Sequence, residues 1–146
     1  MHSSTFSGNA VSMAAGAAAM AQVDAPLIAR LDHLGERLRA GFNRAFEREG
    51  VRGQATGIGS LANLHLTDQP VSNARDSLDG VLSAGQVIGL LHLMMLERGV
   101  FGASRLMYCT SAAMTPDDVD HAVTALEDVL ATLKPGLEHE APQLLT

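Results

Sequence analysis

The sequence contains a single cysteine, Cys109, among 146 residues. One cysteine cannot form a disulfide within the chain or provide a cysteine-based zinc site, so the composition favours a reducing compartment and we expect a cytoplasmic protein. Tryptophan is absent, and aromatic residues make up 3% of the chain. The core must therefore be built from Leu, Val, Ile, Met and Ala, which favours closely packed helices.

Positive charge is also scarce. Ten Lys and Arg residues stand against sixteen Asp and Glu, which gives a formal net charge of −6, and only one of the ten is a lysine. The basic residues form no cluster along the sequence. The charge pattern therefore argues against a nucleic-acid surface or an anionic membrane as a partner.

The sequence lacks a long hydrophobic run. The apolar stretch at residues 10–21 is short of the ~20 residues that a transmembrane helix requires. It also makes a poor export signal, because no Lys or Arg precedes it and it is mostly alanine, whereas export signals are usually leucine-rich. We expect neither a membrane span nor a signal peptide. An exported small domain would instead need cleavage near residues 21–25.

The sequence does contain strong helical periodicity. Apolar residues recur at spacings near 3.6, and Asp24 and Gly50 provide start and stop signals for the longest pattern. The sequence Thr115-Pro116-Asp117-Asp118 combines an N-cap, a first-turn proline and an acid at the third position, which is a strong start signal. We expect helices over residues 10–22, 24–50, 78–99 and 116–135, the last closed by Pro135-Gly136, with residues 137–146 as a mobile tail.

Short alternating segments between these helices predict strands. Residues 51–56 and 60–67 flank the turn Gly57-Ile58-Gly59 and predict a β-hairpin. Residues 100–101 can start a short strand, and residues 106–111 predict a further one. The expected fold is an α+β domain, in which a small antiparallel sheet of three to four strands is covered by helices on one face and the Ala-rich first helix stands apart.

Single residues add little chemistry on their own. Three histidines lie on predicted helices without Asp, Glu or Cys at ligand spacing, so we expect surface or hydrogen-bonded core positions and propose no metal site: His33, His92 and His121. The same reading applies to His65, which alternates away from the apolar face of its strand. Cys109, on a predicted strand, is expected to be a small buried hydrophobe. These residues alone do not indicate the function of the domain.

The first residues of the chain resemble a known family. His2-Ser3-Ser4-Thr5-Phe6-Ser7-Gly8-Asn9, followed by Ser12-Met13-Ala14-Ala15-Gly16, is similar to the segment H-G-G-T-F-S-G-N-P-x-x-M-A-A-G of class III (subgroup II) pyridoxal-phosphate aminotransferases, near glutamate-1-semialdehyde aminomutase. Ser3-Ser4 replace the paired glycines, and Ala10 replaces the common proline. Three later segments resemble the C-terminal domain of the same family in the same order: residues 53–65, 97–101 and 111–120.

The resemblance implies that this chain is only the C-terminal part of a much longer fold-type I subunit. Residues 1–23 would be the phosphate-loop segment and linking helix, residues 24–136 the small domain, and residues 137–146 the tail. The family's Schiff-base lysine and the groups that hold the cofactor ring precede this part. The one lysine present, Lys134, stands at the predicted end of the last helix, where a solvated cation is expected. The chain alone should therefore be inactive.

The resemblance also assigns site residues. It implies that Thr5, with Ser4 as a further donor, binds the phosphate of pyridoxal 5'-phosphate in the active site of a homodimer mate. It implies that Arg105 binds the substrate carboxylate, because the aminomutase pattern has a phenylalanine-glutamate pair there and the β-amino-acid branch has an arginine. The alternative interpretation is that Arg105 is a strand-end residue in a surface ion pair and has no role in catalysis.

The expected activity is transfer of an amino group between an amino acid, with β-amino acids favoured, and a 2-oxo acid. The large-domain part of the enzyme and a second subunit would be the partners. Two alternatives stay open: an isomerase of the glutamate-1-semialdehyde 2,1-aminomutase type, and a non-catalytic α+β binding module in which Thr5 has no cofactor role.

Overall fold

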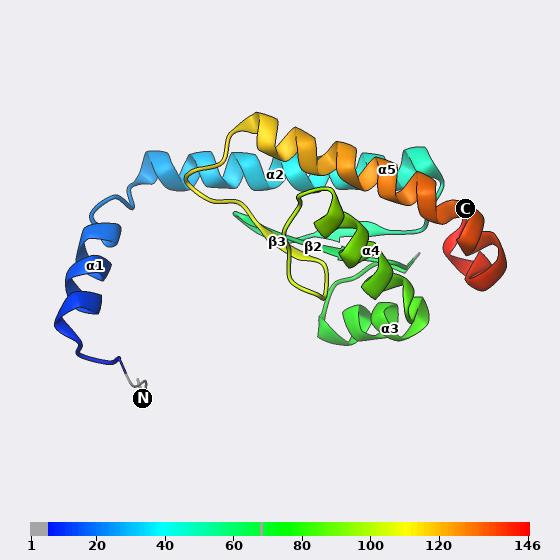
Figure 1. The fold of residues 1–146 in the computed structure, drawn as a ribbon, viewed down its shortest axis with the longest axis horizontal. Coiled ribbons are helices and arrows are strands. Elements are labelled where there is room, and N and C mark those ends of the chain that lie inside the picture. The colour runs from blue at the N-terminus through cyan, green and yellow to red at the C-terminus, as the bar shows by residue number, and fades with distance from the viewer. Residues whose placement is uncertain (1–5, 68) are drawn as a thin grey trace.

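The computed structural model describes residues 6–67 and 69–146 as an α+β domain, which confirms the predicted fold class. Two long helices lie side by side along the three-stranded sheet, a pair of shorter helices packs below them, and the first helix stands apart (Figure 1). The helices are α1 (Ala10–Met20), α2 (Ala25–Glu49), α3 (Ala74–Ala84), α4 (Val87–Glu97) and α5 (Pro116–Glu140).

Helix α2 begins and ends where its sequence signals predict. Asp24 Oδ1 accepts a hydrogen bond of 2.8 Å from the N–H of Leu27, and Gly50 ends the helix in the left-handed conformation with φ 66°. Its apolar stripe packs against the sheet and α5, where burial of each large side chain contributes about 1.5–3 kcal/mol. The buried large side chains are Leu34, Leu38, Phe42 and Phe46.

The sheet is antiparallel, with strand order β1-β2-β3, and its strands are β1 (Gln54–Thr56), β2 (Leu61–His65) and β3 (Met107–Cys109). Each strand is shorter than predicted. The expected strand at residues 100–101 is wrong, because the N–H of Val100 instead bonds the carbonyl of Met95 and closes the end of α4.

The single helix expected between Leu78 and Gly99 is wrong. Gly85, with φ 54°, separates two helices, and the first of them starts earlier, at a capping box between Asn73 and Asp76. Leucine and isoleucine continue at helical spacing on both sides of Gly85, which is why periodicity did not reveal the break. The bend turns α3 toward β2 and α4 toward α5, so that the two helices form one wall of a cleft.

Helix α5 starts at the predicted capping box of Thr115 and Asp118 but does not end at Pro135-Gly136. It continues through Pro135 to Glu140, because Leu133 and Leu137, one turn apart, are both buried and anchor the helix on either side of the proline. The predicted end was therefore wrong.

The last residues fold back onto the domain instead of trailing away. A 3₁₀ turn at Pro142–Leu144 buries Leu144, whose carbonyl accepts a hydrogen bond of 2.7 Å from the N–H of Arg52. Leu145 forms an isolated β-bridge with Val51, which therefore lies outside β1. The tail thus closes the core at the junction of α2 and β1.

Helix α1 has a well-formed start but no buried residue. Asn9 Oδ1 accepts from the N–H groups of Val11 and Ser12 at 3.0 and 3.1 Å, and the helix then projects away from the domain (Figure 1). No single helix in the described ranges is long and apolar enough to cross a membrane. Two pairs of helices, α1 with α2 and α3 with α4, are joined at a sharp bend. Each pair is long and apolar enough to cross a membrane only when its two helices are counted together.

Candidate functional site

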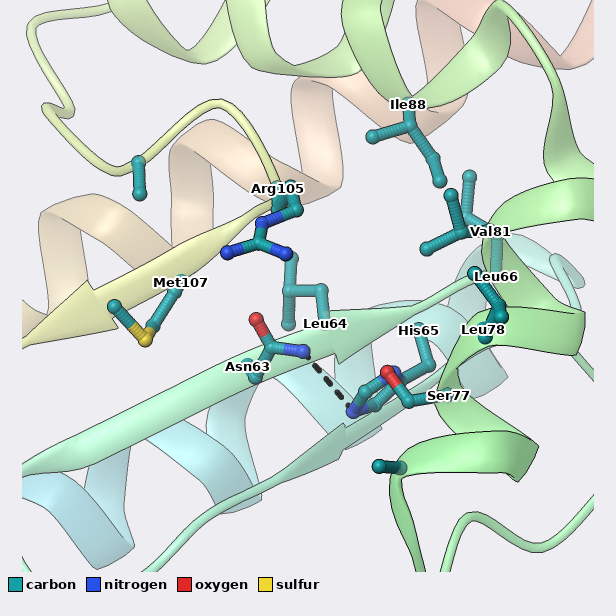
Figure 2. Close-up of a pocket in the computed structure, with 12 residues that line it drawn as sticks. Asn63, Leu64, His65, Leu66, Ser77, Leu78, Val81, Ile88, Arg105 and Met107 are labelled. Carbon is teal, nitrogen blue, oxygen red and sulfur yellow. Dashed lines mark hydrogen bonds between the residues drawn. The ribbon is translucent and has the colours of Figure 1, made fainter.

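A cleft of about 500 Å³ opens between β2, the α3–α4 wall and the loop that precedes β3. Its walls are mainly apolar, and its polar side chains converge from β2, from α3 and from the turn before β3 (Figure 2). The apolar lining includes Leu64, Leu66, Leu78, Val81, Ile88 and Met107, and the polar lining consists of Asn63, His65, Ser77 and Arg105. An apolar cleft with a few convergent polar groups is typical of a small-molecule site.

Arg105 is presented to this cleft by a tight turn. The N–H of Leu106 bonds the carbonyl of Ala103 at 2.8 Å, the N–H of Ala103 bonds the carbonyl of Met107 at 2.8 Å, and Leu106 adopts a positive φ of 61°. This non-glycine left-handed residue is held in place by complete burial of its own side chain. The turn leaves Arg105 exposed at the mouth of the cleft, with its guanidinium over Asn63 (Figure 2).

Within the described residues, Arg105 forms no ion pair and no side-chain hydrogen bond. The surface ion pair that the alternative interpretation of Arg105 requires is therefore not observed among the described residues. Arg105 is also the only residue with a permanent charge among the described cleft-lining residues. Its planar fork of donors is thus free for an anionic ligand.

His65 lies deeper in the cleft and is 6% exposed. Its Nε2 lies 2.9 Å from Thr56 Oγ1 and 3.2 Å from Asn63 Nδ2, and its Nδ1 lies 3.4 Å from Ser77 Oγ. Burial lowers the pKa of His65 because it disfavours the charged imidazolium. The histidine is thus a neutral hydrogen-bonded link between β1, β2 and α3.

The sequence did not single out His65 as a neighbour of Arg105. The antiparallel ladder that pairs Asn63 with Met107 continues through a hydrogen bond from Leu64 N–H to the carbonyl of Leu106, which brings Arg105 to the level of His65. Only a correct β2–β3 register could have revealed this proximity, and a single sequence does not determine that register.

The other predicted residues lie apart from the cleft or beyond description. Ser4 and Thr5 fall outside the described residues. Lys134 is not the solvated cation that was expected: its Nζ donates a hydrogen bond of 2.8 Å to the carbonyl of Glu49 and caps the end of α2. His121 Nε2 lies 2.9 Å from the carbonyl of Arg98. No group of three or more His, Cys, Asp and Glu within residues 6–67 and 69–146 could hold a metal ion.

Cys109 is exposed, so the expectation of a small buried hydrophobe was wrong. Strand alternation is the reason, since Tyr108 and Thr110 on either side occupy the buried positions. The Tyr108 ring packs edge to face on Phe42, with centroids 5.4 Å apart. Burial raises the pKa of Tyr108 to about 12, so the phenol stays neutral.

Comparison with known proteins gives this fold and cleft a context. No protein-family model matches the chain. The chain is 36% identical over 126 residues to a β-phenylalanine transaminase of Variovorax paradoxus, which covers 86% of the chain but 28% of the relative. It is 33% identical over 132 residues to a glutamate-1-semialdehyde 2,1-aminomutase of Desulfosudis oleivorans, covering 88% of the chain and 30% of that protein.

A solved ω-transaminase from Sphaerobacter thermophilus superimposes with a TM-score of 0.73 at 34% identity, covering 89% of the chain and 30% of the transaminase. The chain thus spans less than a third of the length of these relatives. The α+β fold and the sequence similarity define the chain as a homologue of class III transaminases. It corresponds to a C-terminal portion of these enzymes, and β-phenylalanine transaminase is one of its homologues.

The described residues do not by themselves fit the pyridoxal phosphate that this class uses. Covalent attachment needs a lysine amine, and Lys134 is bonded to Glu49 and does not line the cleft. The cleft instead offers one unpaired guanidinium, hydrogen-bonding side chains and an apolar wall. This set suits the substrate side of such a reaction better than the cofactor side.

Proposed function

We propose that this chain forms the C-terminal portion of a pyridoxal-phosphate-dependent aminotransferase that moves an amino group between an amino acid, with β-amino acids favoured, and a 2-oxo acid. The unpaired guanidinium of Arg105 in an apolar cleft is the observation that carries this proposal. Similarity to a β-phenylalanine transaminase supports it.

In this proposal Arg105 binds the substrate carboxylate. Its guanidinium offers two parallel donors that match the two oxygens of a carboxylate, and it keeps its charge when the bound substrate excludes water. The apolar wall, including Leu78, Val81 and Ile88, would contact an apolar or aromatic substrate side chain. Arg105 would thus select substrates that combine a carboxylate with an apolar group.

In this proposal the other catalytic and cofactor-binding groups come from the large-domain part of the enzyme and from the second subunit. Pyridoxal phosphate, when bound, supplies the electron sink that transamination requires. The large-domain part of the enzyme would provide the lysine and the ring contacts. Residues 1–23 would reach the active site of the homodimer mate, where Thr5 and Ser4 bind the cofactor phosphate. The 146-residue chain alone would be inactive.

The aminomutase alternative rests on relatives of nearly equal identity, such as the protein of Desulfosudis oleivorans. Arg105 distinguishes the two readings, because it replaces the phenylalanine-glutamate pair of the aminomutase pattern. Net transfer of an amino group from a β-amino acid to a 2-oxo acid would favour the transaminase reading, whereas isomerisation of glutamate-1-semialdehyde would favour the aminomutase reading.

The test is steady-state kinetics of Arg105→Ala in the complete enzyme. β-Phenylalanine and 1-phenylethylamine form a matched pair of amino donors that differ by the carboxylate. Loss of a charged hydrogen-bond donor costs about 1.5–3 kcal/mol, so kcat/KM for β-phenylalanine should fall by roughly tenfold to a hundredfold while that for the amine changes little. Equal loss on both donors, or loss on neither, would refute the carboxylate role.

A further inference from the structure

The side chains below Arg105 form a row of close polar contacts centred on His65. Asn63, at the centre of β2, lies opposite Thr56 on one side and Met107 on the other. Its Nδ2 lies 3.2 Å from His65 Nε2, two residues along the same strand. The opposite end of the amide, Oδ1, points toward the guanidinium of Arg105 (Figure 2).

This orientation of the Asn63 amide pairs with one tautomer of the histidine. The amide nitrogen can only donate, so His65 Nε2 must accept, and the ring proton must then lie on Nδ1. Nδ1–H faces Ser77 Oγ at 3.4 Å, and in this tautomer the Thr56 hydroxyl, 2.9 Å from Nε2, shares the single Nε2 lone pair with the Asn63 amide. The buried site, which disfavours the imidazolium, is consistent with this neutral form.

We propose that Asn63 and His65 are positioning residues for Arg105: neutral His65, as the Nδ1–H tautomer, holds the Asn63 amide so that Oδ1 faces the guanidinium and orients it for a carboxylate. This inference deepens the proposed function and rests on it. Met107, opposite Asn63 on the other side, is apolar and provides no competing acceptor. Asn63 is the cleft-lining side chain that Figure 2 places beneath the guanidinium.

The reverse arrangement makes the proposal testable. If His65 carried its proton on Nε2, the Asn63 oxygen would turn to the ring and its NH₂ group would face the guanidinium, donor against donor. Nitrogen NMR of the isotopically labelled 146-residue chain distinguishes the two tautomers of His65 directly. The proposal predicts the Nδ1–H tautomer at neutral pH. The Nε2–H tautomer would overturn it.

Kinetics of the complete enzyme provide the functional readout. His65→Leu removes the acceptor for the Asn63 amide, so KM for β-phenylalanine should rise about tenfold, as expected for loss of one oriented hydrogen bond, with kcat nearly unchanged. His65→Gln, whose amide oxygen can replace Nε2 as the acceptor, should restore most of the affinity. Both variants should change the KM for 1-phenylethylamine much less than His65→Leu changes the KM for β-phenylalanine.

Arg105→Ala in the same assay tests the carboxylate role of Arg105 separately from the positioning role of Asn63 and His65. If Arg105→Ala discriminates between the donors but His65→Leu and His65→Gln impair both donors equally, the positioning role is refuted and the carboxylate role of Arg105 stands. If Arg105→Ala does not discriminate, the carboxylate role fails, and the positioning role fails with it. Selective loss in His65→Leu with recovery in His65→Gln would establish the inference.

Discussion

Arg105 and His65 belong to one cleft but differ in solvation. The guanidinium is exposed and keeps its charge in water, whereas the imidazole is buried and loses it. A ligand carboxylate would meet a hydrated cation at the mouth and a neutral hydrogen-bond network beneath it. The exposed guanidinium thus provides the charge that recognises an anion, and the neutral His65 avoids the free-energy cost of a buried cation.

The buried histidine predicts how stability depends on pH. Burial lowers the pKa of His65 in the folded state below the ordinary value of about 6.5, so the unfolded chain binds the proton first as pH falls. Stability should therefore be complete above the ordinary histidine pKa and decrease as pH falls below it. Urea unfolding at about pH 7.5 and about pH 5.5 measures this, since carboxylates titrate mainly below that window.

The control for this prediction is His65→Gln, which cannot titrate. The variant should show a smaller loss of unfolding free energy between the two pH values than the native chain. Asp76 and Asp118, whose pKa values are lowered by hydrogen bonds within their capping boxes, should affect only more acidic solutions. An identical pH dependence in both proteins would contradict the role given to His65.

At the scale of elements, the capping box of α5 illustrates how local chemistry determines a helix end. Asp118 Oδ2 accepts from Thr115 N–H at 2.7 Å and from Thr115 Oγ1 at 2.8 Å, and Thr115 Oγ1 lies 3.4 Å from the Asp118 N–H. Thr115→Ala should lower the free energy of unfolding by about 1 kcal/mol. Thr124→Ala, at an exposed site within the same helix, is the matched control and should be nearly neutral in chemical denaturation.

Helix α1 gives a second prediction at this scale. Its Ala-rich sequence buries nothing on this chain, and isolated helices of this length are marginal in water. Residues 10–20 should therefore exchange their amide protons rapidly in the 146-residue chain, while α2 and α5 are protected. Strong protection of α1 in a monodisperse monomer would contradict our proposal that it packs on a partner or on the large domain.

The sequence predicted elements best where a chemical signal marks their ends. Asp24, Gly50 and Thr115 mark helix ends through hydrogen bonds and backbone conformation that depend on the residue itself. Gly85 and Pro135 misled the prediction in opposite directions: Gly85 adopts a positive φ and ends α3, whereas the buried Leu133 and Leu137 hold α5 together across Pro135. A glycine within an apolar pattern broke a helix, and a proline between two buried leucines did not.

The same distinction applies to the site. Arg105 was singled out from a family resemblance, and the structure adds that it lies unpaired, within the described residues, beside an apolar cleft. His65 was read as an isolated histidine, because its contacts with Thr56 and Ser77 arise from strand register and helix docking. A site whose residues come from several strands and helices cannot be predicted from the residue spacing within one of those elements.

At the scale of the whole molecule, one end of the chain is integrated into the domain and the other is not. The C-terminal turn is docked through Leu144 and Leu145, whereas α1 stands apart with exposed Val11, Met13 and Met20. This asymmetry supports our proposal that the N-terminal helix contacts a larger partner. The length of the relatives supports the same proposal.

Intact-mass measurement, combined with the visible absorbance spectrum, of the protein purified from cells that make it tests this central claim most directly. The account predicts that the 146 residues occur joined to, or tightly bound by, a larger polypeptide, and that the assembly carries pyridoxal phosphate. A free monomer of 15.3 kDa without cofactor absorbance would contradict it and favour a non-catalytic binding module.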